Sequence, residues 1–184
     1  MIRVSHLEIP DVLVLTLGRH PDTRGYFAEL YSTKAHAEVG VRDTFVQDNL
    51  SMSSKTGTIR GLHFQAPPYS QAKLIRVSRG RILDVALDIR RASPTYGRHV
   101  AVEMSSENGI QMYIPHGFAH GFCTLEPDTE VVYKVSNHYA PQAEMGILWS
   151  DPDLQINWPV SVECATVSDK DVALPLLKNL SVPF

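Results

Sequence analysis

Residues 109–120 read GIQMYIPHGFAH, in which a glycine is followed after five residues by Pro-x-Gly and then, at position 120, by a histidine. The apolar run IQMYIP (110–115) and the run GFCTLE (121–126) each have the length of a short strand. Pro115 and Gly117 lie between them, and these residue types are typical of a turn. The stretch therefore predicts two short strands, with His120 just before the second.

Further strand-like runs lie on both sides of this stretch, at spacings of roughly ten residues. In RILDVALDIR (81–90), apolar residues alternate with Asp84, Ala86 and Asp88, which predicts a half-buried strand. Gly80 separates this run from KLIRVSR (73–79). The other runs are VLVLTL (12–17), YFAELY (26–31), HVAVEMS (99–105) and TEVVYKVSNHY (129–139). Regular short strands of this kind predict an antiparallel sandwich or barrel.

Two short helical pieces are expected outside the strands. The segment TKAHAEVG (33–40) begins with Thr33, a suitable N-cap, and Gly40 lies just past its end. Near the C-terminus, VSDKDVALPLLKNL (167–180) places Asp171 three residues after Ser168, which resembles a capping box.

Composition excludes several classes of protein. A length of 184 residues fits one domain spanning 1–184, and a net charge of −3 does not indicate a globally basic nucleic-acid binder. No apolar run approaches the ~20 residues that a membrane span requires, and the N-terminus lacks the apolar core of a signal peptide. Cys123 and Cys164 show no metal or redox spacing. We therefore expect a soluble, cytoplasmic protein with reduced, buried thiols, and neither a nucleic-acid nor a membrane partner.

The chain between Asp48 and Asp84 contains no carboxylate. It does contain six cations, namely Lys55, Arg60, Lys73, Arg76, Arg79 and Arg81. Cations whose side chains point inward from strands would attract an anionic substrate such as a phosphate or diphosphate. Alternatively, each of them solvates the outer face of a sheet. The histidine within this stretch, His63, could be a metal ligand, a catalytic base or a core residue.

The glycine, Pro-x-Gly and histidine of residues 109–120 resemble the second cupin motif, and Gly57 with His63 resembles the start of the first. This resemblance implies an all-β cupin jelly roll with short peripheral helices. Metal-binding cupins carry a second histidine in the first motif, where this chain has Gln65, and a glutamate near Tyr69. Glutamine is a poor ligand for transition metals, so the sequence argues against a metal site.

Several longer motifs are similar to the dTDP-4-dehydrorhamnose 3,5-epimerase family, in order and over nearly the whole chain. They are DTRGYFAELY (22–31), FVQDNLS (45–51), IRGLHFQ (59–65), AKLIRVSRGRILDVALDIRRASPTYG (72–97), YIPHGFAHGF (113–122) and YKVSNHYAPQAEMGILWSDP (133–152). The resemblance implies an isomerase that inverts carbons 3 and 5 of a dTDP-linked 4-keto-6-deoxy sugar. It also implies a homodimer, and a reaction that needs neither a metal nor another cofactor.

The resemblance further implies four catalytic residues. His63 matches the base, and Asp171 the carboxylate that orients it. Tyr133 matches the acid on the opposite face of the sugar, and Lys73 a cation beside the enolate oxygen. Without the resemblance, Asp171 would be interpreted as a helix cap and Tyr133 as a core aromatic.

Substrate-binding positions carry over in the same way. Arg24 and Arg60 resemble residues that hold the diphosphate, and Tyr139 a tyrosine that stacks on the thymine ring. In a homodimer, the N-terminal residues would reach the partner's site. The other matching positions are Phe27, Glu29, Gln47, Asn49, His120, Glu144 and Lys170.

Three alternatives remain at this stage. A mono-epimerase acting at carbon 3 or carbon 5 alone would keep the same four catalytic residues. A non-catalytic sugar-nucleotide-binding cupin would lose the base or the acid, and neither is lost. A metal-dependent cupin enzyme is disfavoured by Gln65.

Overall fold

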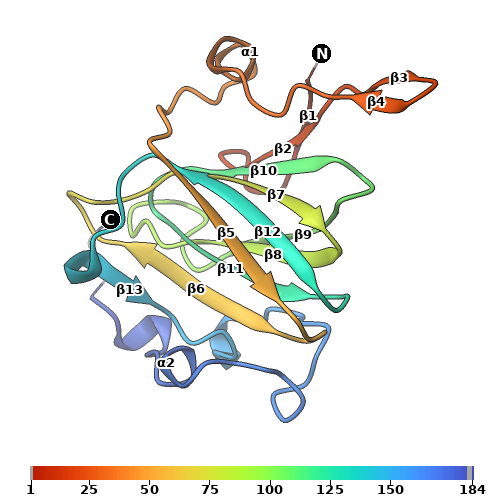
Figure 1. Ribbon diagram of the computed structural model, residues 1–184. Coiled ribbons are helices and arrows are strands. Elements are labelled where there is room, and N and C mark those ends of the chain that lie inside the picture. Colours follow the sequence, from red (N-terminus) through yellow and green to blue (C-terminus); the bar gives the residue numbers. More distant parts are fainter. Residues whose placement is uncertain (1, 182–183) are drawn as a thin grey trace.

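Two antiparallel sheets face one another in the computed structural model, which describes residues 2–181 and 184 (Figure 1). The six-stranded sheet has the order β1 (Arg3–His6), β2 (Leu13–Thr16), β10 (Ile110–Ile114), β7 (Lys73–Arg79), β12 (Thr129–Val135) and β5 (Gln47–Ser53). The five-stranded sheet has the order β13 (Glu144–Gly146), β6 (Ile59–Gln65), β11 (Phe118–Thr124), β8 (Arg81–Asp88) and β9 (His99–Ser105). This is the jelly roll that the sequence predicts.

Smaller elements lie outside the two sheets. A hairpin of β3 (His20–Asp22) and β4 (Gly25–Phe27) projects from the body of the molecule (Figure 1). The helices are α1 (Thr33–Glu38) and α2 (Asp169–Val172), and the 3-10 turns are η1 (Pro141–Ala143), η2 (Pro152–Leu154) and η3 (Leu177–Asn179). No helix of the described residues is long and apolar enough to cross a membrane.

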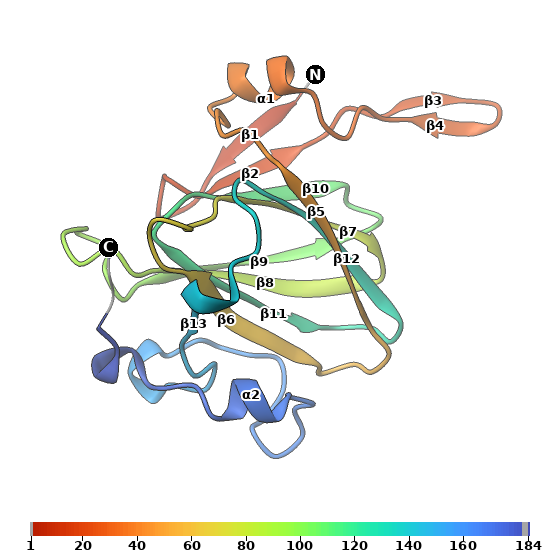
Figure 2. The same ribbon diagram turned by 60° about the vertical axis from the view of Figure 1, so that its left-hand side comes forward.

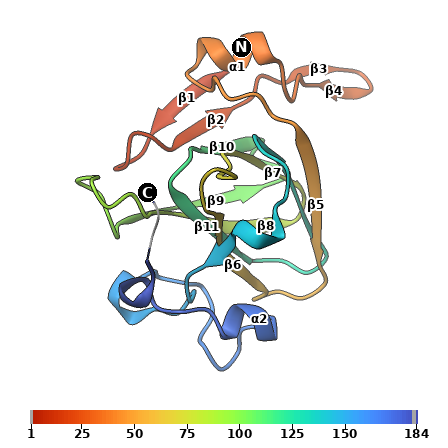
Figure 3. The same cartoon turned by 90° about the vertical axis from the view of Figure 1, so that its left-hand side faces the viewer.

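The strand period of two decides what lies between the sheets (Figure 3). On β7, Ile75 and Val77 are buried in the apolar cluster that fills one end of the space between the sheets. Lys73, two residues before Ile75, therefore points to the same interior. The same alternation directs His120 inward beside Phe122, and Tyr133 inward beside Val131. One end of the jelly roll is therefore an apolar core, and the other carries polar side chains.

The outer face of the five-stranded sheet is covered, and that of the six-stranded sheet is covered in part (Figure 2). The C-terminal segment packs under the five-stranded sheet, where Leu154 and Leu177 join Leu62 and Phe64 in one apolar cluster. The N-terminal segment and α1 cover part of the six-stranded sheet, in a cluster that includes Leu13, Leu15, Val41, Leu74 and Tyr113. The tail thus fixes β6 and, with it, the inward direction of His63.

Strand β8 corrects the prediction of a half-buried strand. Asp84, Ala86 and Asp88 are fully buried, and so are Val85 and Leu87 on the other face. The alternation is present, but the C-terminal segment covers the face that would otherwise meet water. The carboxylates that the pattern would place in solvent therefore point between the sheets, where Asp88 pairs with the guanidinium of Arg90 and Asp84 with the ring of His120.

Three local predictions also need correction. The N-cap of α1 is Ser32, whose Oγ accepts from the Ala35 amide, and Thr33 is the first helical residue. The strand expected over 26–31 ends at Phe27. Cys123 is buried as expected, whereas Cys164 is exposed. By contrast, the chain breaks at Gly80 as predicted, because this glycine adopts a φ of 78°.

Candidate active site

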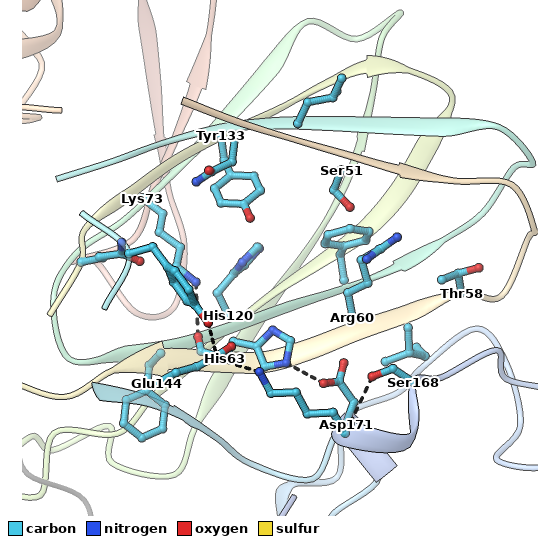
Figure 4. A pocket seen from close by; sticks show the side chains of 18 of the residues that line it. Ser51, Thr58, Arg60, His63, Lys73, His120, Tyr133, Glu144, Ser168 and Asp171 are labelled. Atoms are coloured by element: carbon cyan, nitrogen blue, oxygen red, sulfur yellow. Dashed lines mark hydrogen bonds and ion pairs between the residues drawn. The ribbon is translucent and has the colours of Figure 1, made fainter. Parts of the chain in front are cut away.

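A cavity of about 790 Å³ opens between the two sheets at the polar end of the jelly roll (Figure 4). Strands β5, β6, β7, β11, β12 and β13 line it, together with α2 and the loop before it. Eleven of the fourteen residues that the sequence singles out lie in its wall: His63, Tyr133, Asp171, Lys73, Gln47, Asn49, Arg60, His120, Tyr139, Glu144 and Lys170.

His63 and Asp171 form a hydrogen-bonded pair, although 108 residues separate them in sequence. The Nε2 of His63 lies 2.8 Å from Oδ1 of Asp171, and the backbone N–H of Gly61 donates to the other carboxylate oxygen at 3.1 Å. Burial raises the pKa of Asp171, but the hydrogen bond from His63 and the charge nearby outweigh it, so the pKa is below its ordinary value. An ionised Asp171 accepts a hydrogen bond from Nε2–H of His63, and in the neutral tautomer that donates from Nε2 the other ring nitrogen, Nδ1, carries no proton.

The local structure of α2 explains why Asp171 faces the histidine. Ser168 caps the helix, as predicted, with its Oγ accepting from the Asp171 amide at 3.2 Å. The Asp171 carboxylate does not return to the cap as in a capping box, because it bonds His63 and Gly61 instead. The carboxylate is therefore held by the strand, while its backbone is held by the cap.

Close backbone approach brings β6 against β11 at the same point. A Cβ on Gly61 would lie 2.6 Å from Cα of Gly121, and one on Gly121 would lie 2.7 Å from the carbonyl oxygen of Arg60. Only glycine fits at both positions, and Gly61 also adopts a φ of 120°. These glycines set the spacing of the strands that carry His63 and His120.

Lys73 is a buried cation in the cavity wall, with 8% of its surface exposed. Its Nζ donates to the carbonyl oxygen of His63 at 3.3 Å. Burial lowers the pKa of Lys73 to about 8, and the carboxylates of Asp84 and Glu144 oppose that fall. The side chain thus keeps a proton at pH 7 and places a positive charge beside His63.

His120 is held by a carboxylate that sequence reasoning did not assign to the site. Its Nε2 lies 2.6 Å from Oδ1 of Asp84, and both side chains are buried. Burial lowers the pKa of His120, although Asp84 acts in the opposite direction. Neutral His120 therefore donates Nε2–H to Asp84 and keeps Nδ1 as an acceptor. The available signal was a carboxylate within the apolar run LDVALD (83–88).

Tyr133 enters the cavity from β12, on the side opposite His63 (Figure 4). Burial raises the pKa of Tyr133, while the nearby Arg60 guanidinium lowers it by a smaller amount. The phenol therefore holds its proton at neutral pH and presents an O–H donor to the cavity.

The mouth of the cavity is polar. Tyr139 donates its hydroxyl proton to Oε2 of Glu144 at 2.8 Å, and Nζ of Lys170 lies 2.6 Å from the same oxygen. Burial raises the pKa of Glu144, but Lys170 and Tyr139 outweigh it and keep that pKa below its ordinary value. Arg60 donates to Ser53 Oγ and to the carbonyl oxygen of Met52 at the end of β5.

The acid-free stretch is only partly a cavity wall. Of its six cations, Arg60 and Lys73 line the cavity, whereas Arg81 pairs with Glu103 and Glu126 outside it. Carboxylates from outside the stretch nevertheless act on Lys73, namely Asp84 and Glu144, and both Glu144 and Asp171 line the cavity. Absence of acid in the sequence therefore does not mean absence of acid in the folded site.

Gln65 has partners that differ from those of a metal ligand. Its amide bonds three backbone groups, from Tyr69, His138 and Ala140. Among the residues that the structure describes, no three His, Cys, Asp or Glu side chains are arranged to hold a metal ion.

Three predicted binding residues lie away from the cavity. Arg24, Phe27 and Glu29 lie on or just after the projecting β3–β4 hairpin. The Arg24 side chain is 87% exposed and pairs with Asp22 of the same hairpin. These residues therefore do not contribute to the cavity of their own chain.

Comparison with known proteins places this geometry in context. A family model described as dTDP-4-dehydrorhamnose 3,5-epimerase matches residues 6–179. A relative of that name from Shigella flexneri is 49% identical, over 93% of each chain.

Two solved structures are similar throughout. A 3,5-epimerase from Bacillus anthracis with TDP and PPi bound has a TM-score of 0.93 and 45% identity, covering 96% of this chain and 99% of that one. A dTDP-6-deoxy-D-glucose-3,5-epimerase from Legionella pneumophila, in complex with dTDP-4-keto-L-rhamnose, has a TM-score of 0.93 and 40% identity. The match covers 98% of this chain and 95% of that one.

Proposed function

The chain belongs to the dTDP-4-dehydrorhamnose 3,5-epimerase family, and we propose that its cavity converts dTDP-4-dehydro-6-deoxyglucose to dTDP-4-dehydrorhamnose. The protein is an isomerase of deoxysugar biosynthesis. The observation that carries the proposal is the bond of 2.8 Å between His63 and Asp171, beside Lys73 and across the cavity from Tyr133.

The chemistry follows from the ketone at carbon 4. Carbons 3 and 5 lie next to it, so loss of a proton from either gives an enolate whose negative charge rests on oxygen. Nδ1 of His63 takes that proton, and the resulting imidazolium is stabilised by Asp171. The Lys73 ammonium stabilises the enolate oxygen. Tyr133 then returns a proton to the opposite face of the carbon, which inverts it.

Binding roles are proposed for the rest of the cavity. Arg60, near the start of β6, supplies a guanidinium for the diphosphate, and Tyr139 at the mouth supplies a ring for the nucleobase. His120 offers Nδ1 as an acceptor for a sugar hydroxyl. Gln47, Asn49, Glu144 and Lys170 contact the nucleotide and sugar. No step needs a metal or another cofactor.

The position of the hairpin favours a homodimer. Arg24, Phe27 and Glu29 lie outside their own cavity on a projecting element, so we propose that they complete the cavity of a second copy. In that arrangement Arg24 adds a second guanidinium to the diphosphate site.

The decisive experiment is incubation with dTDP-4-dehydro-6-deoxyglucose in deuterated water, with NMR of the product. We expect deuterium at carbons 3 and 5 and release of dTDP-4-dehydrorhamnose. Deuterium and inversion at one carbon alone would instead identify a mono-epimerase, and binding without deuterium a non-catalytic protein. The incubation is repeated with a chelator. If the chelator abolished the activity and a divalent metal restored it, the metal-free mechanism would be contradicted.

Replacing the base provides the matched variant. His63→Ala should abolish deuterium incorporation at both carbons while dTDP still binds, because the cation sites are intact. Tyr133→Phe should impair inversion more than exchange, since proton removal does not need the phenol. Near-normal turnover by His63→Ala would show that another group is the base.

A further inference from the structure

Gln65 lies in the cavity wall, two residues after His63, and is 5% exposed. Its Nε2 donates to the carbonyl oxygen of Tyr69 at 2.7 Å and to that of His138 at 3.2 Å. Its Oε1 accepts from the buried N–H of Ala140 at 2.8 Å. The amide thus uses both donors and its oxygen on backbone groups, and contributes no group to the reaction described above.

A second glutamine, Gln47, holds Tyr139, which lies between His138 and Ala140. Oε1 of Gln47 accepts from the Tyr139 N–H at 3.2 Å, and its Nε2 donates to Oδ1 of Asn49 at 2.8 Å. Three consecutive residues, 138 to 140, are therefore fixed through their backbones by two side chains. These side chains come from β6 and β5, on opposite sheets.

This arrangement matters because residues 138–140 belong to no strand or helix. Backbone N–H and C=O groups outside a β-sheet need other hydrogen-bond partners, and here the side chains of Gln65 and Gln47 supply them. The segment carries Tyr139, whose side chain is 54% exposed and whose hydroxyl bonds Glu144. The position of the Tyr139 ring thus depends on a backbone that Gln65 holds at both ends.

We propose that Gln65 is a positioning residue that presets Tyr139 for the nucleobase of the substrate. The inference rests on the proposed function, because it assumes that Tyr139 stacks on that base. Ordering the segment before binding removes an entropic cost that would otherwise weaken the complex. Gln65 therefore acts on nucleotide affinity and not on proton transfer.

Gln65→Met tests this, because methionine keeps the volume and removes all three hydrogen bonds. By calorimetry, we expect dTDP to bind roughly tenfold more weakly, since a buried N–H loses its acceptor and the segment loosens. Inorganic pyrophosphate, which lacks the base, should bind as it does to the natural chain. KM for the nucleotide sugar should rise, while kcat stays within about twofold. Unchanged dTDP affinity would overturn the proposal.

A double-mutant cycle shows whether Gln65 acts through Tyr139. In a Tyr139→Ala background, Gln65→Met should have no further effect on dTDP affinity, whereas additive losses would contradict the mechanism. Thr129→Val is the matched control. Thr129 is fully buried and donates to the carbonyl oxygen of Glu126 at 2.8 Å, at the other end of β12, so its loss should leave dTDP binding unchanged.

Two further results keep the test decisive. If Gln65→Met does not fold, Gln65→Asn keeps an uncharged amide that is one methylene too short to bond both His138 and Ala140, and it should also weaken dTDP selectively over pyrophosphate. Equal weakening of both ligands would indicate general damage and overturn the proposal. If the natural chain epimerises its substrate but Gln65 variants bind dTDP normally, only this inference fails. If the natural chain does not bind dTDP, both fail.

Discussion

At the scale of single residues, the cavity wall holds a buried cation, Lys73, whose charge nearby carboxylates offset only in part. Lys73 is an ammonium within the protein, and its environment supplies the carboxylates of Asp84 and Glu144, which only partly offset its burial. Such a cation favours an enolate over a neutral ketone, because the enolate oxygen brings a negative charge next to the ammonium. The same imbalance should make Lys73 unfavourable for folding.

Lys73→Met should therefore stabilise the protein while removing its activity. The folded pKa of about 8 lies below the unfolded value of 10.5, so the unfolded chain binds more protons between these pH values. Above pH 10.5, Lys73 is neutral in both states and does not destabilise the fold. As the pH falls toward 8, the unfolded chain binds the proton first, so the free energy of unfolding decreases. At pH 7 the variant should be more stable, on the order of 2 to 3 kcal/mol, by urea denaturation.

The advantage of Lys73→Met should shrink as the pH rises from about 8 to 10.5. Activity of the natural chain should fall over the same rise, because the ammonium is lost. Lys73→Arg keeps the charge throughout, so any activity that it retains should lack this alkaline fall. If the difference in stability between Lys73→Met and the natural chain did not depend on pH, Lys73 would not be buried as a cation.

At the scale of elements, one turn of helix holds the carboxylate of Asp171 beside His63. Helix α2 has four residues, too few to be stable without its cap. Ser168 supplies that cap through the Asp171 amide itself. The cap and the carboxylate therefore share one residue, and fraying of the turn would move Asp171 away from His63.

Ser168→Ala should lower stability by about 1 kcal/mol and reduce kcat roughly tenfold, since the base loses its orientation. Ser168→Thr should restore both, because threonine also caps. Ser32→Ala is the control, as Ser32 caps α1 outside the cavity through the Ala35 amide. It should cost similar stability and leave kcat unchanged. Equal losses of kcat in Ser168→Ala and Ser32→Ala would contradict a specific role for Ser168.

The sequence predicts some elements of this site well, and its failures have physical causes. Gly80, Ser168 and the strand period are local signals, so they were predictable. The inward direction of Asp84 was not, because the C-terminal segment that covers Val85 and Leu87 on the outer face of β8 is remote in sequence. The local pattern around Asp171 predicted only a helix cap, and it was the family resemblance that pointed to His63 as the partner of this carboxylate.

At the scale of the whole molecule, the two ends of the chain have different tasks. The C-terminal segment brings Asp171 to the cavity and covers the five-stranded sheet, while the N-terminal segment covers part of the other sheet and extends the hairpin outward. We infer that residues 1–184 work as one domain, whose cavity is completed by a hairpin from a second copy.

Mixing two inactive variants tests that arrangement. Arg24→Ala removes the guanidinium of the hairpin, and His63→Ala removes the base of the cavity. If the hairpin serves the partner, a mixed dimer holds one site with neither defect, formed by the cavity with His63 and the hairpin with Arg24. After subunit exchange at equal concentrations, half of the dimers are mixed, so activity should recover to about a quarter of that of the natural chain. If the hairpin served its own cavity, both sites of every mixed dimer would be defective and mixing would restore nothing. Light scattering of each variant provides the control, because both must still form dimers for the comparison to hold.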